Sequence, residues 1–236
     1  MISLIIDENS SALLKTRVGG KDIVKIISWA EASNILHSYA GISSGLLPRG
    51  ARYFRANGDE VIIAFDFPPS KQTLCVKHDY QTKIYKIDNV PLPGGIWILR
   101  LVKTNSSYSV GGAILAATKS PGIIDENTCL YQWPTPNVDY DGRVCWNRDH
   151  HLISNIKTVS AVYGIHKFFL VTNFNDHLWH HGSLSRNFHY DGFNVQDIEK
   201  YFQKLADCEV FDESLLVSLK PPNLKSALSV ISSRKY

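Results

Sequence analysis

The segment PTPNVDYDGRVCWN, residues 134–147, places an amide side chain, Asn137, upstream of a thiol, Cys145. A thiolate is a strong nucleophile and a good leaving group, and a nearby amide N–H can stabilise the oxyanion formed when an amine attacks a thioester. With an ordinary pKa of about 8.5, a few per cent of a thiol is ionised near neutral pH, which suffices for exchange with an activated donor. These residue types allow acyl transfer through Cys145, while a role as a small buried apolar residue stays open at this point.

The residues between and around this pair predict a rigid loop. The two prolines lack a backbone N–H and push the preceding residues towards extended conformations, so residues 133–137 are predicted to be extended and outside any strand ladder. Asp141 and Gly142 predict a tight turn that presents Cys145 immediately afterwards.

Length and composition indicate one globular domain. The chain has 236 residues, of which 44% are hydrophobic and 20% charged, and no apolar run reaches the length of a membrane-spanning helix. The formal net charge is +3, but the basic residues are scattered, so we expect neither a nucleic-acid nor a membrane partner. The N-terminal segment has no basic leader and reads as a first strand, which predicts a cytoplasmic protein.

Four cysteines are widely spaced and never form a C-x-x-C pair, which in a cytoplasmic protein predicts free thiols. Cys75 lies in an apolar strand pattern and Cys208 closes an amphipathic helix, so both are expected in or near the core. Cys129, just before Leu130, is ambiguous.

Periodicity predicts an α+β order along the chain. Residues 28–41 predict a helix that begins with a capping box at Ser28 and Glu31, and a turn-rich stretch follows over 41–58. Five short strands with tight connections then suggest an antiparallel meander, at 59–67, 71–78, 82–87, 95–103 and 108–117.

The last third of the chain changes character. Residues 154–171 place apolar residues on one helical face, with Ser154 or Asn155 as a cap, and residues 194–208 predict a second amphipathic helix. The cysteine segment therefore lies at the junction between the sheet and the helices, where irregular backbone often carries function.

Residues 135–145, TPNVDYDGRVC, resemble the active-site segment of ubiquitin-conjugating enzymes, in which His-Pro-Asn precedes the thioester cysteine at the same separation. The match comprises Pro136, Asn137, Val138, Gly142 and Cys145, and Thr135 stands in place of the histidine. The similarity is greater to the prokaryotic branch typified by protein B of the ParB-related, ThiF-related cassette (PRTRC) system, whose members read LY-x-x-P-x-x-NV-x-x-x-G-x-VC. Here residues 129–146 read CLYQWPTPNVDYDGRVCW, and weaker likeness on both sides extends the resemblance over 45–182.

This resemblance implies a ubiquitin-conjugating-enzyme-like fold and a division of the chain. Residues 1–44 would form an N-terminal strand and helix extension, 45–182 the conjugating-like core and 183–236 a C-terminal helical extension, all within one compact domain. It also implies a transferase in a bacterial ubiquitin-like conjugation system. The implied partners are a ThiF-like adenylating enzyme, a small β-grasp ubiquitin-like protein and a JAB-type peptidase.

Within this family the cysteine carries the ubiquitin-like protein as a thioester, so the resemblance assigns the acyl group to Cys145. It assigns Asn137 to oxyanion stabilisation or to bracing the loop, and Thr135, Pro136, Asp141 and Gly142 to shaping it. No residue after Cys145 matches the acidic group that helps to deprotonate the incoming amine in the wider family.

Other side chains near the loop receive weaker assignments. His150 or His151 could accept a proton or lower the thiol pKa, because histidine titrates near neutrality, and exposed loop residues are the alternative. Trp133 and Trp146 bracket the loop; they either pack it against the sheet or, if exposed, dock a partner.

No cofactor or metal site is predicted. The histidine-rich stretches match no established metal-ligand spacing, and the glycine pairs form no nucleotide-binding motif, so ATP would be used by another protein.

Two further readings stay open beside the transferase. One is a non-catalytic adaptor that keeps the fold and docks the same partners. The other is a hydrolase with a Cys-His pair, formed by Cys145 and a histidine from the region of 150 or 177.

Overall fold

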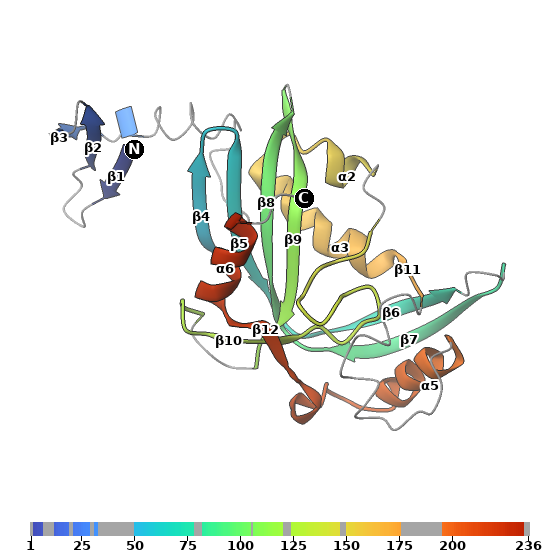
Figure 1. Cartoon of the computed structure of the whole chain (residues 1–236). Helices are drawn as coiled ribbons and strands as arrows, with labels where there is room; N and C mark the ends of the chain where they lie inside the picture. Colours follow the sequence, from blue (N-terminus) through green and yellow to red (C-terminus); the bar gives the residue numbers. More distant parts are fainter. Residues whose placement is uncertain are drawn as a thin grey trace.

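The computed structural model describes residues 2–6, 12–18, 21–28, 31–32, 50–77, 82–104, 106–119, 124–146, 150–175 and 195–233. Within these residues the fold is mixed α/β: strands dominate, a curled antiparallel sheet forms the centre, and helices pack against it (Figure 1). The expected α+β class is confirmed at this level.

The central sheet has six strands in the order β12-β10-β9-β8-β5-β4, and every neighbouring pair is antiparallel. Its middle strands are rich in β-branched and aromatic residues and are buried on both faces, so they read as nearly continuous apolar runs. The strands are β4 (Ala51–Asn57), β5 (Glu60–Phe67), β8 (Gly95–Thr104), β9 (Ser107–Ala117), β10 (Cys129–Gln132) and β12 (Ser218–Asn223).

Strands β6 (Ser70–Lys77) and β7 (Ile84–Leu92) extend β5 and β8 into one long bent hairpin (Figure 1). The register continues across the bend, because Phe67 pairs with Gly95 before it and Ser70 with Leu92 after it. The bend falls where Pro68-Pro69 on one arm meets Pro93-Gly94 on the other, since proline supplies no N–H to a ladder. The strands of the predicted meander are therefore present. At Pro68-Pro69 and Pro93-Gly94, however, the chain bends within one hairpin, whereas the sequence analysis expected turns between separate strands.

The bent part of the hairpin forms its own three-stranded sheet, in the order β11-β6-β7. Strand β11 (Asn173–Phe174) lies parallel to β6 and comes directly after the helix at Tyr163–Val171, which packs on the central sheet. Helix α5 (Val195–Ala206) packs on β6 and β7 with Ile198, Phe202 and Leu205 buried, which confirms the second amphipathic helix within the residues described.

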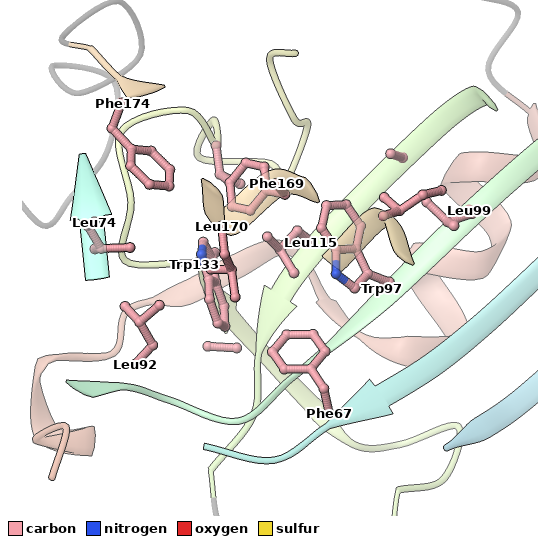
Figure 2. Close-up of a cluster of buried hydrophobic side chains, with 14 of the residues drawn as sticks. Phe67, Leu74, Leu92, Trp97, Leu99, Leu115, Trp133, Phe169, Leu170 and Phe174 are labelled. Carbon is pink, nitrogen blue, oxygen red and sulfur yellow. The ribbon is translucent and has the colours of Figure 1, made fainter. Parts of the chain in front are cut away.

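Both faces of the central sheet are covered, which divides the core into two clusters. On one face the strands pack against α3 (Tyr163–Val171), and Figure 2 shows the aromatic centre of this cluster around Trp97 and Phe169. On the other face α6 (Leu224–Ser233) packs against the residues that alternate with them, including Ile62, Ile98 and Ile114.

The predicted helix over 154–171 is broken into three parts. A short helix, α2 (His151–Ser154), comes first, and a 3₁₀ turn (Val159–Val162) then leads directly into α3. The break arises because Ile156 exchanges two backbone hydrogen bonds with Tyr108 of β9, at 2.9 and 2.8 Å. The cap is His150, not Ser154 or Asn155.

Several elements were not predicted. Strand β4 lies within the stretch expected to be turn-rich, and β12 and α6 lie in the part expected to be a helical extension. Because β12 pairs with β10 and α6 covers a whole face of the sheet, the C-terminal part completes the core.

At the N-terminus, β1 (Ile2–Ile6), β2 (Ala12–Val18) and β3 (Lys21–Ile27) form a separate antiparallel sheet, of which only β1 was expected. The capping box is present: Ser28 N–H donates to the Glu31 carboxylate at 2.9 Å, and Glu31 N–H donates to Ser28 Oγ at 3.2 Å. The rest of the predicted helix, 33–41, lies outside the described residues. No helix in the described part of the chain is long and apolar enough to cross a membrane.

His166 of α3 is held neutral within the core. Its Nδ1 accepts a hydrogen bond from the indole N–H of Trp97 at 3.1 Å, and its ring stacks on Phe67 with centroids 3.9 Å apart. Burial lowers the pKa of His166 from 6.5 to about 4. The unfolded chain therefore binds a proton between these two pH values that the folded chain does not, so stability falls as the pH falls through this window.

We expect the free energy of unfolding to drop by about 2 kcal/mol between about pH 7 and pH 5 because of this histidine. In a His166→Gln variant, which does not titrate, this part of the slope should vanish; urea unfolding at both pH values measures it. His151→Gln, at an exposed site, is the control and should keep the wild-type slope. A His166→Gln protein with the wild-type slope would contradict the assignment.

Candidate active site

The cysteine loop, residues 133–146, is a compact and mostly buried piece of backbone. Thr135 N–H donates to the Trp133 carbonyl at 2.9 Å, and Val138 N–H donates to the Thr135 carbonyl at 3.3 Å. The prediction of an extended segment over 133–137 is therefore wrong: the prolines lie within consecutive tight turns, which their fixed φ also allows.

The second half of the loop is a small hairpin held against β9. Val138 and Val144 form a bridge, and Asp139 N–H donates to the Arg143 carbonyl at 2.8 Å. The predicted tight turn is present at its tip, where Gly142 has a φ of +81° and its carbonyl accepts from Leu115 N–H at 2.9 Å. This contact fixes the turn to the sheet.

Arg143 joins two buried carboxylates and was not found from the sequence. Its guanidinium contacts Asp139 at 2.8 Å and Asp141 at 3.0 Å, and both aspartates are less than one-tenth exposed. The hydrogen bond with Asp141 is the main cause that raises the pKa of Arg143. The signal was the alternation of Asp139, Asp141 and Arg143, which puts all three on one side of the hairpin.

Cys145 leaves this buried frame and is exposed. Its N–H donates to the Asn137 carbonyl at 2.8 Å, so the two residues identified from the sequence meet through the backbone. Among the other cysteines, Cys75 is half-buried, whereas Cys129 and Cys208 are exposed. The core position expected for Cys208 is wrong, because it lies just beyond the end of α5 and its thiol contacts the Lys204 carbonyl at 3.7 Å.

The Asn137 side chain is turned away from a direct role at the sulfur and towards β11. Its Nδ2 donates to the Asn173 carbonyl at 3.3 Å, and its Oδ1 accepts from Asn175 N–H at 3.4 Å. The side chain is only 9% exposed, so both contacts replace lost hydration. Of the two roles considered for Asn137, this geometry supports bracing of the loop.

Other residues of the loop are buried within it. Pro136 is buried, and Thr135, in the position of the family's histidine, is 2% exposed. Among the described residues, Thr135 Oγ1 and Trp133 Nε1 have no hydrogen-bond partner. Thr135 therefore shapes the loop through its two backbone hydrogen bonds.

The two bracketing tryptophans differ in exposure. Trp133 is 2% exposed and packs edge-to-face on Phe67, with centroids 5.4 Å apart, so it has no surface to offer and its predicted role in partner binding is wrong (Figure 2). Trp146 is half-buried and stacks on Trp97, with ring planes 10° apart.

His150 and His151 lie at the start of α2. His150 Nδ1 accepts from Leu152 N–H at 3.3 Å, and its ring stacks on Phe168 with centroids 4.0 Å apart, while His151 is exposed beside it. Within the described residues no hydrogen bond joins either ring to Cys145. Residues 147–149, which connect the two groups, lie outside the described part.

The histidine-rich segment over 176–194 also lies outside the described residues. In the part of the chain that is described, no group of three or more potential metal-ligating side chains gathers. Comparisons of the chain with protein-family models, with curated proteins and with solved structures find no match.

Gly142→Ala should lower the free energy of unfolding by about 2–4 kcal/mol, because alanine disfavours positive φ and overpacks this site. An added Cβ would lie 2.8 Å from Ile114 Cγ2 and 3.2 Å from the Leu115 carbonyl oxygen. Gly164→Ala is the matched control: this helical glycine has open space around it, so alanine should stabilise by about 0.5–1 kcal/mol. Urea denaturation of both variants measures the contrast, and equal effects would contradict it.

Asn137→Ala should lower the free energy of unfolding by about 1–3 kcal/mol, because it removes the two hydrogen bonds that this buried side chain makes with the backbone of Asn173 and Asn175. Asn127→Ala, at an exposed turn, should change it little. If Asn137→Ala were as stable as wild type, the bracing contacts would not exist in solution.

Proposed function

We propose that this protein is a ubiquitin-conjugating-like transferase that carries a ubiquitin-like protein as a thioester on Cys145 and passes it to an acceptor. The observation that carries the proposal is the exposed Cys145 thiol at the end of a buried, hydrogen-bonded loop, with its N–H bonded to the carbonyl of the upstream asparagine. A cysteine that only fills space in the core would be buried, whereas a cysteine that carries a thioester has to be accessible to two large protein partners.

The arrangement of elements supports the same proposal. The cysteine loop follows directly after the antiparallel sheet and is itself followed by α3, which is the order implied by the resemblance to the PRTRC protein B family. We propose that these elements form a conjugating-enzyme-like core. The bent hairpin, the β12-α6 segment and the N-terminal sheet would then be additions that belong to this chain.

The chemistry needs a donor that is activated elsewhere. A ThiF-like enzyme would use ATP to adenylate the C-terminus of the ubiquitin-like protein and hold it as a thioester. The Cys145 thiolate attacks that carbonyl, a new C–S bond forms, and the thiolate of the activating enzyme leaves. An acceptor amine then attacks, the Cys145 thiolate leaves, and the amine proton passes to a base.

Cys145 would act as nucleophile and leaving group in these steps, and Asn137 would keep the loop against β11. Arg143 offsets the charge of the two buried carboxylates of the loop and so holds together the hairpin that leads to Cys145. His150 and His151 remain the proposed proton acceptors. A reduced thiol is required throughout, which fits a cytoplasmic setting.

A non-catalytic adaptor is the second candidate, and the Asn137 side chain favours it. Both amide atoms are engaged by the 173–175 backbone, so in this conformation they do not point a donor at an oxyanion. An adaptor would dock the same ThiF-like enzyme and ubiquitin-like protein without forming a covalent adduct.

Incubation with a ThiF-like enzyme, a β-grasp ubiquitin-like protein and ATP should give an adduct that is sensitive to reductant. With Cys145→Ser, either no adduct or an adduct that resists reductant should form, because serine gives an oxyester, which thiol reductants do not cleave. Cys129→Ser, which removes another exposed thiol, is the control and should keep the sensitive adduct. Electrophoresis with and without reductant measures each case.

An adduct that persists unchanged in Cys145→Ser would rule out Cys145 as the carrier. Binding of both partners with no adduct in the wild-type protein would favour the adaptor. Turnover of a simple ester, without ATP or partners, would point to the hydrolase.

A further inference from the structure

The cysteine loop is anchored at its C-terminal end by an aromatic contact. Trp146 follows Cys145 directly, and its ring stacks on Trp97 with centroids 5.5 Å apart and planes 10° apart. Trp97 is the third residue of β8, has no exposed surface and also packs edge-to-face on Phe169. The residue next to the thiol is therefore tied to a fully buried residue of the central sheet.

Trp97 is itself fixed by a polar contact in the core. Its indole N–H donates to His166 Nδ1 at 3.1 Å, and the His166 ring is held by stacking on Phe67. A buried indole N–H needs an acceptor, and a neutral histidine with its proton on Nε2 supplies one. The hydrogen bond with His166 fixes the orientation of the Trp97 ring plane, and Trp146 stacks on that plane.

We propose that His166 and Trp97 are positioning residues for Cys145, which they hold in place through Trp146. The thiol is then fixed from both sides: its own N–H is bonded to the Asn137 carbonyl, and the next side chain is clamped on β8. As a device for acyl transfer this anchor rests on the proposed function, whereas its effect on the backbone at Cys145 does not.

A fixed sulfur matters for transfer because the attacking groups belong to other proteins. A small displacement of a nucleophile lowers the rate of a reaction between positioned groups steeply. Cys145 itself is exposed, and a single backbone hydrogen bond restrains an exposed residue weakly. The stacking of Trp146 on Trp97 supplies a second contact that restrains the position of Cys145.

Hydrogen exchange measured amide by amide tests the anchor. Trp146→Ala and His166→Leu should each speed the exchange of the Cys145 amide about tenfold, because the loop opens locally more often. The Leu115 amide, bonded to the Gly142 carbonyl on the other side of the loop, is the internal reference and should keep its rate. Trp146→Phe, which keeps a ring, and His166→Gln, which keeps an acceptor, should both restore slow exchange at Cys145.

Equal acceleration of the Cys145 and Leu115 amides would overturn the proposal, because it would show only general destabilisation. Unchanged exchange at Cys145 in Trp146→Ala or His166→Leu would overturn it as well. Thioester formation is assayed on the same samples. A wild-type protein that forms no adduct, yet shows the expected exchange pattern, would refute the transferase and leave the anchor standing.

Discussion

Strand β8 is buried on both faces and paired on both edges, and both core clusters of the central sheet are built on it. On one face Trp97 meets α3 and the cysteine loop, and on the other Ile98 meets the α6 layer. A strand in this position cannot shift register by one residue without exchanging the two cores. The contacts with the sheet therefore hold the candidate site in place, and the hydrogen bonds within the loop add local order.

The cysteine loop illustrates a division of labour between backbone and side chains. Its turns, its bridge and its contact with β9 are made by main-chain groups. Side chains also hold it, and two of them lie close to the thiol in sequence or in the loop. Asn137 reaches β11 and Trp146 reaches β8, so the loop is tied to two distant parts of the chain at the residues that flank its chemistry.

Local patterns in the sequence predicted the elements whose causes are local. The apolar runs of β5 and β8, the capping box at Ser28 and the turn at Gly142 all follow from neighbouring residues. The site was predicted to the same extent: Asn137 and Cys145 were identified, and their proximity was expected.

The bent hairpin was not predicted, because Pro68-Pro69 is typical of a turn unless the strand opposite it is known. Strand β12 was missed because Pro221 and Pro222 argue against a strand, although an edge strand tolerates them. The partners of Asn137 and Trp97 depend on tertiary contacts, which periodicity does not encode.

The continuous register of the bent hairpin also bears on how the chain reaches this structure. Lys77 of β6 pairs with Ile84 of β7, so β5 to β8 can pair progressively from that end with little loop-closure entropy at each step. Strand β12 instead meets β10 across a long stretch of sequence that includes the cysteine loop and α3. During synthesis the loop would leave the ribosome while one face of its sheet still lacks α6. The β12-α6 segment, which is made after the loop, is therefore the one that shields this face from other chains.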